Sequence, residues 1–336
     1  MAKISDIAKR ANVSESAVSF ALNNKPGVSE SKRKEILEIA KELNFKPRKR
    51  AASNGSAGRI GFLRIVKHGN ILNRDHDAFI SDYIYGINQA CKDNKFDIDL
   101  LDFEGCNEQL VNSIDKQRFQ GVVVLGTELS PDDINLFRNV ETPLVFLDTY
   151  YRFVKFNFVT MNNLDALFDI VSHLSSRGAK TIEFVTADSV CANIREREAA
   201  FGIVMRELGL AGDGVILHQM PSTFTGAYEG MSALIASGHQ NPDAYVCAND
   251  IMALGCMKAL KEKGFNIPGD VSITGFDDLP GSARTDPGLT CYQVPKREIG
   301  QSGADLLFEA IRRGGERFSS IKSMVDGQLI VRASTA

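Results

Sequence analysis

The sequence predicts a small helical head at the N-terminus, joined to a larger α/β body built on parallel sheets. Two patterns support this prediction. Three short amphipathic segments follow one another in the first 50 residues, and from residue 59 onward strand-length apolar runs alternate with helix-length amphipathic stretches. The length of 336 residues is also enough for a small domain and one or two larger cores.

The sequence of the head predicts three helices separated by very short turns. In each segment the apolar residues recur at helical spacing, and Ser14 and Ser29 occupy the N-cap positions of the second and third helices. The apolar stripes are Ile4, Ile7, Ala8 and Ala11; Val18, Ala21 and Leu22; and Ile36, Ile39, Ala40 and Leu43. Two helices joined by so short a turn are typical of a helix-turn-helix, whose second helix can enter a DNA major groove. A plain three-helix bundle is the alternative.

The distribution of charge favours DNA binding by the head. Residues 1–50 contain 12 Lys and Arg against 6 Asp and Glu, whereas the rest of the chain contains 27 against 36. A basic head on an acidic body suits a polyanion, since the body's own charge opposes nonspecific docking elsewhere. A solvated basic tail would show the same excess. The exposed face of the second helix is predicted to carry Glu15, Ser16, Ala17, Ser19 and Phe20.

A linker is predicted between the head and the body. Residues 46–58 change from basic to small and flexible side chains, and Pro47 disfavours helical geometry at the residue before it. We therefore expect a helix-turn-helix DNA-binding domain at 1–47, a hinge or linker at 48–58, and a separate larger domain at 59–336.

The body predicts two lobes, because the alternation of strands and helices is typical of parallel sheets and is long for a single sheet. The expected strands are Arg59–Ile65, Ile98–Phe103, Gly121–Leu125, Leu144–Leu147, Phe158–Met161, Thr181–Thr186, Gly214–His218, Ala244–Cys247 and Ser272–Phe276. The expected helices are Phe79–Asn94, Glu108–Arg118, Leu164–Arg177, Arg195–Leu208, Ala227–Ser237, Asp250–Lys263 and Arg297–Arg313. We expect one lobe at about 59–158 plus 294–318 and the other at about 160–290 plus 320–336.

Polar side chains follow several predicted strands, at the edge where ligands bind in such folds. Directly after strands come Asp148, Asn162, Asn249-Asp250 and Asp277-Asp278, and Arg195 opens a helix. Carboxylates, amides and an arginine that converge on a cleft suit a polyhydroxylated ligand such as a sugar. Helix capping is the alternative for each residue taken alone.

Several classes of protein are disfavoured. The six cysteines are scattered without a C-x-x-C pair, and the histidines lack ligand spacing on any one helix, so we expect free thiols, a cytoplasmic protein and no metal site. No apolar segment is long enough to span a membrane or to act as a signal peptide. Dinucleotide, phosphate-loop, zinc-protease and nucleophile-elbow motifs are absent, which predicts no catalytic residues and no cofactor.

Residues 3–47 resemble the DNA-binding head of the LacI/GalR repressor family. The matching positions are Asp6, Ile7, Ala8, Ala11, Val13, Ser14, Val18, Ser19, Leu22, Asn23, Val28, Ser29, Arg33 and Pro47. In the body, Asn249–Gly255 is similar to the family's N-D-x-M-A-x-G, and Pro268–Asp278 to its P-x-D-[VI]-S-[VI]-x-G-[FY]-D-D. Arg195-Glu196-Arg197 resembles the family's R-x-R, and Leu289–Gln293 its L-T-T-x-x-Q.

This resemblance implies a transcription repressor that binds double-stranded operator DNA as a homodimer. It implies that residues 59–336 form a periplasmic-binding-protein-like, effector-binding and dimerisation domain, whose effector is a small molecule such as a carbohydrate. It implies DNA contacts from Ser14, Glu15, Ser16, Ser19, Phe20, Asn23, Ser29, Arg48, Lys49 and Arg50. It implies effector contacts from Asp148, Arg195, Asn249, Asp277 and Gln293. A two-lobed sugar-binding protein or a sugar-modifying enzyme without a regulatory role is the alternative.

The sequence departs from the family's pattern in three places. Phe20 replaces the usual base-reading arginine and could contact a thymine methyl instead. In the family, the linker forms a hinge helix on the operator, and a leucine of this helix enters the minor groove. Residues 48–58 contain no leucine, so residues 48–52 are as compatible with an unstructured basic linker as with a hinge helix. Asn70–Phe79 replaces a shorter N-P-[FY], and His76 within it is interpreted as part of a solvated loop, with a pH-sensitive or metal-binding role as the alternative.

Overall fold

The computed structural model describes residues 4–11, 13, 18, 21, 30–43, 57–189, 191–212, 214–314 and 320–335. The chain divides into two compact units, Met1–Asn54 and Gly55–Ala336, which are described separately. No helix within these described ranges is sufficiently long and apolar to cross a membrane.

The head unit contains α1 (Ile4–Ala11) and α3 (Glu30–Glu42). Its core is formed by the predicted apolar stripes, since the buried residues are Ile7, Ala8, Ala11, Val18, Ala21, Ile36 and Ala40. An exposed ion pair joins the two helices, with Arg10 Nη2 at 2.8 Å from Glu42 Oε2. The ten residues predicted to contact DNA lie outside the described residues; they are Ser14, Glu15, Ser16, Ser19, Phe20, Asn23, Ser29, Arg48, Lys49 and Arg50.

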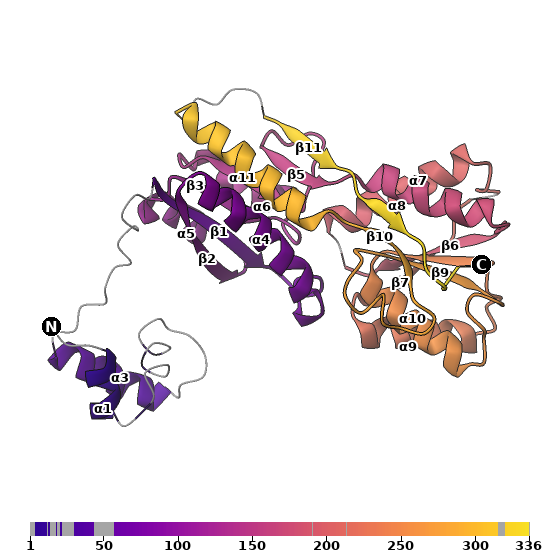
Figure 1. The fold of residues 1–336 in the computed structure, drawn as a ribbon, viewed down its shortest axis with the longest axis horizontal. Coiled ribbons are helices and arrows are strands. Elements are labelled where there is room, and N and C mark those ends of the chain that lie inside the picture. Colours follow the sequence, from indigo (N-terminus) through magenta and orange to yellow (C-terminus); the bar gives the residue numbers. More distant parts are fainter. Residues whose placement is uncertain are drawn as a thin grey trace. The chain divides into compact units, whose positions relative to one another are not determined.

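The body contains two six-stranded sheets, as the alternating pattern predicted, and each forms one lobe (Figure 1). The first sheet has the order β11-β5-β4-β3-β1-β2 and the second β12-β10-β9-β8-β6-β7. Strands of the first sheet are β1 (Gly58–Val66), β2 (Phe96–Glu104), β3 (Gly121–Leu125), β4 (Leu144–Leu147), β5 (Phe158–Met161) and β11 (Lys322–Val325). Strands of the second are β6 (Ile182–Ala187), β7 (Leu217–Met220), β8 (Ala244–Cys247), β9 (Ser272–Phe276), β10 (Thr290–Gln293) and β12 (Gln328–Ile330). The pairs are parallel except β10 with β12.

Helices cover both faces of each sheet. The first lobe has α4 (Asp77–Asp93), α5 (Glu108–Ser113), α6 (Pro131–Leu136) and α11 (Lys296–Arg312). The second has α7 (Asn163–Ser176), α8 (Ala192–Glu207), α9 (Phe224–Ala236) and α10 (Asp250–Glu262). Ile60 and Phe62 pack in the core that includes α4, whereas Leu63 and Ile65 pack in the core that includes α5. Side chains on both faces of the sheet are therefore buried, which explains why the parallel strands are continuous apolar runs in the sequence.

The helices α4 and α11 approach each other unusually closely. A Cβ atom at Gly86 of α4 would lie 2.0 Å from the Arg297 carbonyl oxygen, and one at Gly300 of α11 would lie 2.3 Å from the Tyr83 carbonyl oxygen. Glycine is therefore required on both sides of this contact. The contact places Tyr83 on the inner side of α4, where it is fully buried.

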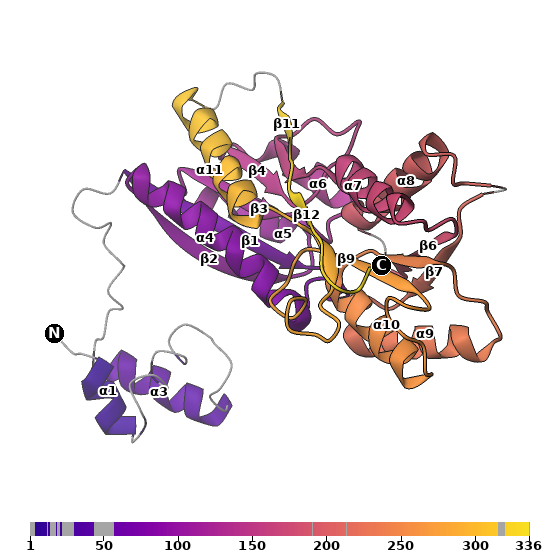
Figure 2. The same cartoon turned by 45° about the vertical axis from the view of Figure 1, so that its right-hand side comes forward.

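The boundary between the lobes differs from the prediction in two places. Residues 320–336 were assigned to the second lobe, but β11 pairs in parallel with β5 in the first sheet. The chain crosses to the second lobe only after Val325, and Figure 2 shows β11 and β12 as successive parts of one crossing segment. The first sheet also retains β5 through Met161, beyond the predicted limit near residue 158.

Candidate functional site

A cavity lies between the two lobes at the carboxyl ends of their strands. Thr127, Asp148, Asn249 and Asp277 follow β3, β4, β8 and β9 and all line this cavity. The first lobe adds an apolar wall, and α8 of the second lobe adds one charged and one amide side chain. The wall consists of Ile71, Leu72, Phe79 and Ile80, and the α8 side chains are Arg197 and Asn193.

Asp148 is buried and hydrogen-bonded on both carboxylate oxygens. Its Oδ1 accepts from the Tyr83 hydroxyl at 2.9 Å and from Asn193 Nδ2 at 2.8 Å, and its Oδ2 accepts from Thr127 Oγ1 at 2.5 Å. Burial raises the pKa of Asp148 above its ordinary value, and these hydrogen bonds oppose the shift. Because Asn193 belongs to the second lobe, its amide links the two lobes directly.

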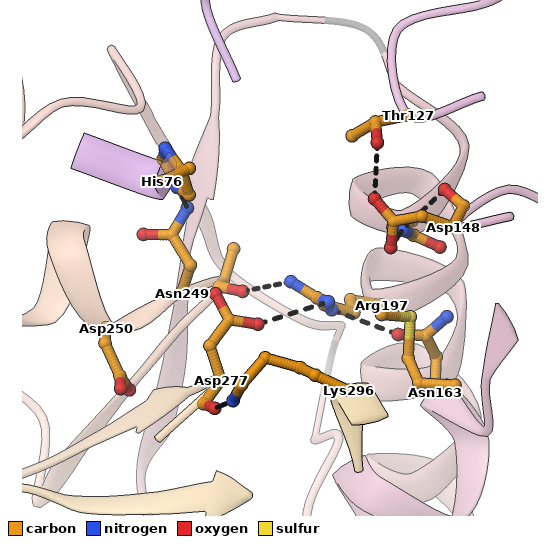
Figure 3. A network of polar contacts seen from close by, with 12 residues as sticks. His76, Thr127, Asp148, Asn163, Arg197, Asn249, Asp250, Asp277 and Lys296 are labelled. Carbon is orange, nitrogen blue, oxygen red and sulfur yellow. Dashed lines mark hydrogen bonds and ion pairs between the residues drawn. The ribbon is translucent and has the colours of Figure 1, made fainter. Parts of the chain in front are cut away.

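Arg197 lines the cavity and is almost fully buried, and Figure 3 shows its guanidinium group between Asp277 and Asn163. Its Nε donates to Asn163 Oδ1 at 3.0 Å, and its Nη1 donates to the Ala248 carbonyl oxygen at 2.6 Å. The guanidinium carbon stands 3.7 Å from the ring centroid of Phe276. These contacts orient the remaining nitrogen, Nη2, toward Asp277, 3.9 Å from its Oδ1.

Asp277 has a buried carboxylate oxygen that the described residues leave without a hydrogen-bond donor, its Oδ1. The residue follows β9 with a positive φ of 114°, and Lys296 at the start of α11 donates to its main-chain oxygen (Figure 3). Burial raises the pKa of Asp277 to about 6, although the positive charges of Arg197 and Lys296 oppose the shift. A buried acceptor of this kind is stabilised by a ligand that donates a hydrogen bond.

Asn249 combines a structural contact with a position on the cavity. Its Oδ1 caps α10 by accepting from the Met252 N–H at 2.9 Å, and its Nδ2 donates to Ser222 Oγ at 2.9 Å. The same Nδ2 lies 3.5 Å from His76 Nε2, which belongs to the first lobe. His76 is 4% exposed, and burial lowers the pKa of its imidazole. The interpretation of His76 as part of a solvated loop was therefore wrong.

Glu128 organises the loop that carries the apolar wall. Its Oε2 accepts hydrogen bonds from the N–H groups of residues 67, 68 and 69, and its Oε1 accepts from those of Ile71 and Leu72, at distances from 2.8 to 3.0 Å. Burial acts to raise the pKa of Glu128, but these hydrogen bonds outweigh it and hold the pKa below its ordinary value. The longer segment at 70–79 is thus an ordered wall of the cavity.

The structure brings three of the five predicted effector residues together, namely Asp148, Asn249 and Asp277. Arg195 is exposed and does not line the cavity, because residues two apart on a helix point about 200° apart, and it is Arg197 that points inward. Gln293 also lies outside the lining: its Nε2 donates to Asp278 Oδ2 at 2.7 Å, and its Oε1 accepts from Gln328.

Sequence reasoning missed Asn193, Arg197 and the inward position of His76. The signal for the first two was available, since Asn193 and Arg197 are four residues apart and share one helical face. No local pattern distinguishes His76, because its burial depends on the opposite lobe.

Comparisons with known proteins agree with this architecture. Residues 3–48 match the model of bacterial regulatory proteins of the lacI family, and residues 171–335 match that of the periplasmic binding protein-like domain. The HTH-type transcriptional repressor PurR of Mannheimia succiniciproducens is 26% identical over 99% of this chain and 98% of its own. The HTH-type transcriptional repressor CytR of Escherichia coli K12 is 29% identical over 99% of this chain and 96% of its own.

Solved structures show the same fold. A transcriptional regulator CelR–cellobiose complex has a TM-score of 0.72 at 20% identity, covering 99% of this chain and 100% of that chain. The lac repressor dimer bound to operator and an anti-inducer has a TM-score of 0.71 at 21% identity, with 99% of each chain covered. A LacI family regulator from Enterococcus faecium with bound ribose has a TM-score of 0.69 at 24% identity, covering 83% of this chain and 98% of that chain.

Proposed function

Because the chain belongs to the LacI family of bacterial regulatory proteins, we propose that it represses transcription at an operator whose occupancy is controlled by a small ligand bound between the lobes. Its relatives are named as transcriptional repressors, and the chain is a regulator of that class, not an enzyme. The protein acts where operator DNA is found, in the cytoplasm.

The arrangement around Asp277 supports ligand binding most directly. Its unbonded Oδ1 and the nearby Arg197 Nη2 offer an acceptor and a donor at the cavity. The amides of Asn193 and Asn249 add further polar groups, and the wall at 71–80 is apolar. Polar groups around an apolar wall suit a sugar or sugar derivative, whose hydroxyls and C–H face differ in the same way. Two of the similar structures contain cellobiose and ribose, which favours this class.

The head is proposed to contact DNA through the residues named from the family resemblance. A single head of about 50 residues reads few base pairs, so two heads of a homodimer act on a two-fold symmetric operator. In this proposal Ser14, Ser19, Asn23, Ser29 and residues 48–50 contact phosphates, and Glu15, Ser16 and Phe20 face bases.

The experiment is a ligand screen on the full-length protein, followed by operator binding. Thermal shift with monosaccharides, disaccharides, sugar phosphates and nucleosides identifies candidates, and an operator is selected from random DNA duplexes. We expect a sugar-class ligand to raise the melting temperature and to change operator affinity at least about fivefold, as allosteric coupling energies predict. The direction of that change distinguishes an inducer from a corepressor. Stabilisation by nucleosides alone contradicts the sugar assignment, and failure to select any DNA contradicts the regulatory role.

A further inference from the structure

Three side chains with metal-binding atoms converge in the second lobe, outside the ligand cavity. His218 Nε2 lies 2.6 Å and His239 Nε2 lies 2.9 Å from the same oxygen, Oε2 of Glu183. The ligating atoms of the three residues all lie within 4.8 Å of one another. Glu183 is buried, whereas the side chain of His239 is 24% exposed, so the cluster has one side toward solvent.

The sheet places these residues together. Glu183 is the second residue of β6, and His218, the second residue of β7, pairs with Val185. Because side chains alternate along a strand, Glu183 and Val185 share a face, which makes Glu183 and His218 diagonal neighbours. His239 lies between α9 and β8. Glu183 and His218 are near the amino ends of their strands and His239 precedes the amino end of β8, whereas Asn249 and Asp277 follow carboxyl ends. The cluster and the ligand cavity therefore lie at opposite edges of the sheet.

We propose that Glu183, His218 and His239 form a binding site for a transition-metal ion of the Zn²⁺ class. Two imidazoles and one carboxylate are a ligand set that Zn²⁺ accepts, with water in the fourth position on the exposed side. Without metal, the short contacts to Glu183 require a hydrogen atom on Nε2 of each imidazole, which donates a hydrogen bond to the carboxylate. With metal, the proton moves to Nδ1 and the Nε2 lone pair binds the ion.

The two nitrogen–oxygen separations in the cluster require only a small adjustment to accept the ion. With metal–ligand bonds near 2.0–2.2 Å, tetrahedral coordination sets neighbouring ligand atoms about 3.3 Å apart. The observed nitrogen–oxygen separations of 2.6 and 2.9 Å therefore open by less than about 1 Å, which small side-chain rotations supply. The ion would tie β6, β7 and the segment before β8 together and so stabilise the second lobe.

The test uses the full-length protein without a histidine tag, under reducing conditions. Zinc binding is measured by calorimetry for the wild type, His239→Gln and His218→Gln, with His173→Gln as the matched control. His173 is a partly buried histidine of the same lobe that contacts Thr335 and is not part of the cluster. We expect one equivalent of Zn²⁺ in the wild type and the control. Losing a direct ligand should weaken binding by more than the roughly 10- to 100-fold typical of supporting residues.

Further measurements distinguish loss of a metal ligand from unfolding of the variant, and binding by this cluster from binding by cysteines. The absorption spectrum of bound Co²⁺ distinguishes nitrogen and oxygen ligands from thiolates, and Glu183→Gln reports on the carboxylate. His239 is on a partly exposed segment, so His239→Gln should fold normally, which circular dichroism checks. Absence of binding by folded wild type, binding that survives in folded His239→Gln, or a thiolate spectrum would each overturn the proposal. The first result would leave the cluster as a purely hydrogen-bonded brace.

Discussion

At the scale of single residues, the ligand cavity concentrates buried charge of both signs. Arg197 donates from Nε to Asn163 and from Nη1 to the Ala248 carbonyl, which leaves Nη2 toward Asp277. The 3.9 Å separation between Arg197 Nη2 and Asp277 Oδ1 is longer than a hydrogen bond. Arg197 Nη2 and Asp277 Oδ1 therefore remain available to hydrogen-bond a ligand. A buried pair in this arrangement contributes little to the stability of the fold.

Asp277→Asn is expected to separate ligand binding from folding. The amide keeps the shape and the main-chain contact with Lys296 but removes the charged acceptor. Hydrogen bonds to charged groups contribute roughly 1.5–3 kcal/mol, so effector affinity should fall about 10- to 150-fold. The melting temperature should not fall, because the amide also removes a buried charge that destabilises the fold near neutral pH. Calorimetry with the effector found by the screen measures this. Asp278→Asn is the control, because Asp278 pairs with Arg332 outside the cavity; an equal loss of affinity there contradicts the assignment.

Asp277 should also make folding stability depend on pH. Burial raises the pKa of Asp277 to about 6 in the folded protein, whereas the pKa of an unfolded aspartate is about 3.9. The folded state therefore holds the proton more tightly, and stability falls as pH rises from about 4 to about 6, by about 3 kcal/mol from this group. Urea unfolding at several pH values should show a smaller decline in Asp277→Asn than in wild type. Asp148 and Asp250, whose pKa values are also raised, still titrate in the variant. Because the charge of Asp277 helps to raise the pKa of Asp250, the difference reports Asp277 together with this coupling. Identical pH profiles would exclude this role.

At the scale of elements, the wall of the cavity depends on one glutamate and not on regular structure. Ile71 and Leu72 lie in a segment without helix or strand, yet five N–H groups of residues 67–72 converge on Glu128. Glu128 follows β3, which is part of the sheet. The sheet thereby transmits its rigidity to a loop that would otherwise have many unpaired donors.

Glu128→Gln should loosen this loop selectively. The glutamine amide presents N–H groups where an oxygen accepted two or three hydrogen bonds, and unsatisfied buried donors cost about 1–3 kcal/mol. We expect amides 67–72 to exchange hydrogen roughly 5- to 150-fold faster, with little change in the second lobe. Mass-spectrometric hydrogen exchange measures this, with Glu141→Gln, an exposed residue of the same lobe, as the control. Unchanged exchange in the loop would contradict the role of Glu128.

At the scale of the whole molecule, the chain separates into a small basic unit and a large acidic one with its own core. A fragment beginning at Arg59 should therefore fold and bind the effector with unchanged affinity, because every cavity residue lies beyond that point. It should lose operator binding, since the helix-turn-helix and its positive charge are removed. Fluorescence anisotropy with operator and calorimetry with effector measure the two activities. Operator affinity retained by the fragment would contradict the division of roles.

Local sequence patterns predicted most of the completely buried strands with accurate bounds, and β6 is displaced by one residue from its predicted range. The strands β3, β4, β5, β8 and β9 begin and end at the predicted residues, because each is a run of buried residues in a parallel sheet. The short strands β10, β11 and β12 and the helix α6 were not predicted. The strands β11 and β12 lie at sheet edges and are not fully buried. They form because they pair with a neighbouring strand, and their sequences therefore carry no clear apolar pattern.

The sequence alone determined the helix-turn-helix pattern, the two parallel sheets and the polar residues at strand ends, since each is visible as a local pattern of apolar and polar residues. Only the tertiary structure decided that Arg197 and not Arg195 enters the cavity, that His76 is buried, and that Gln293 turns to Asp278. The same holds for Glu183, whose partners His218 and His239 are 35 and 56 residues away. These features depend on which surfaces come into contact when the lobes and strands pack. Local sequence periodicity carries no information about those contacts.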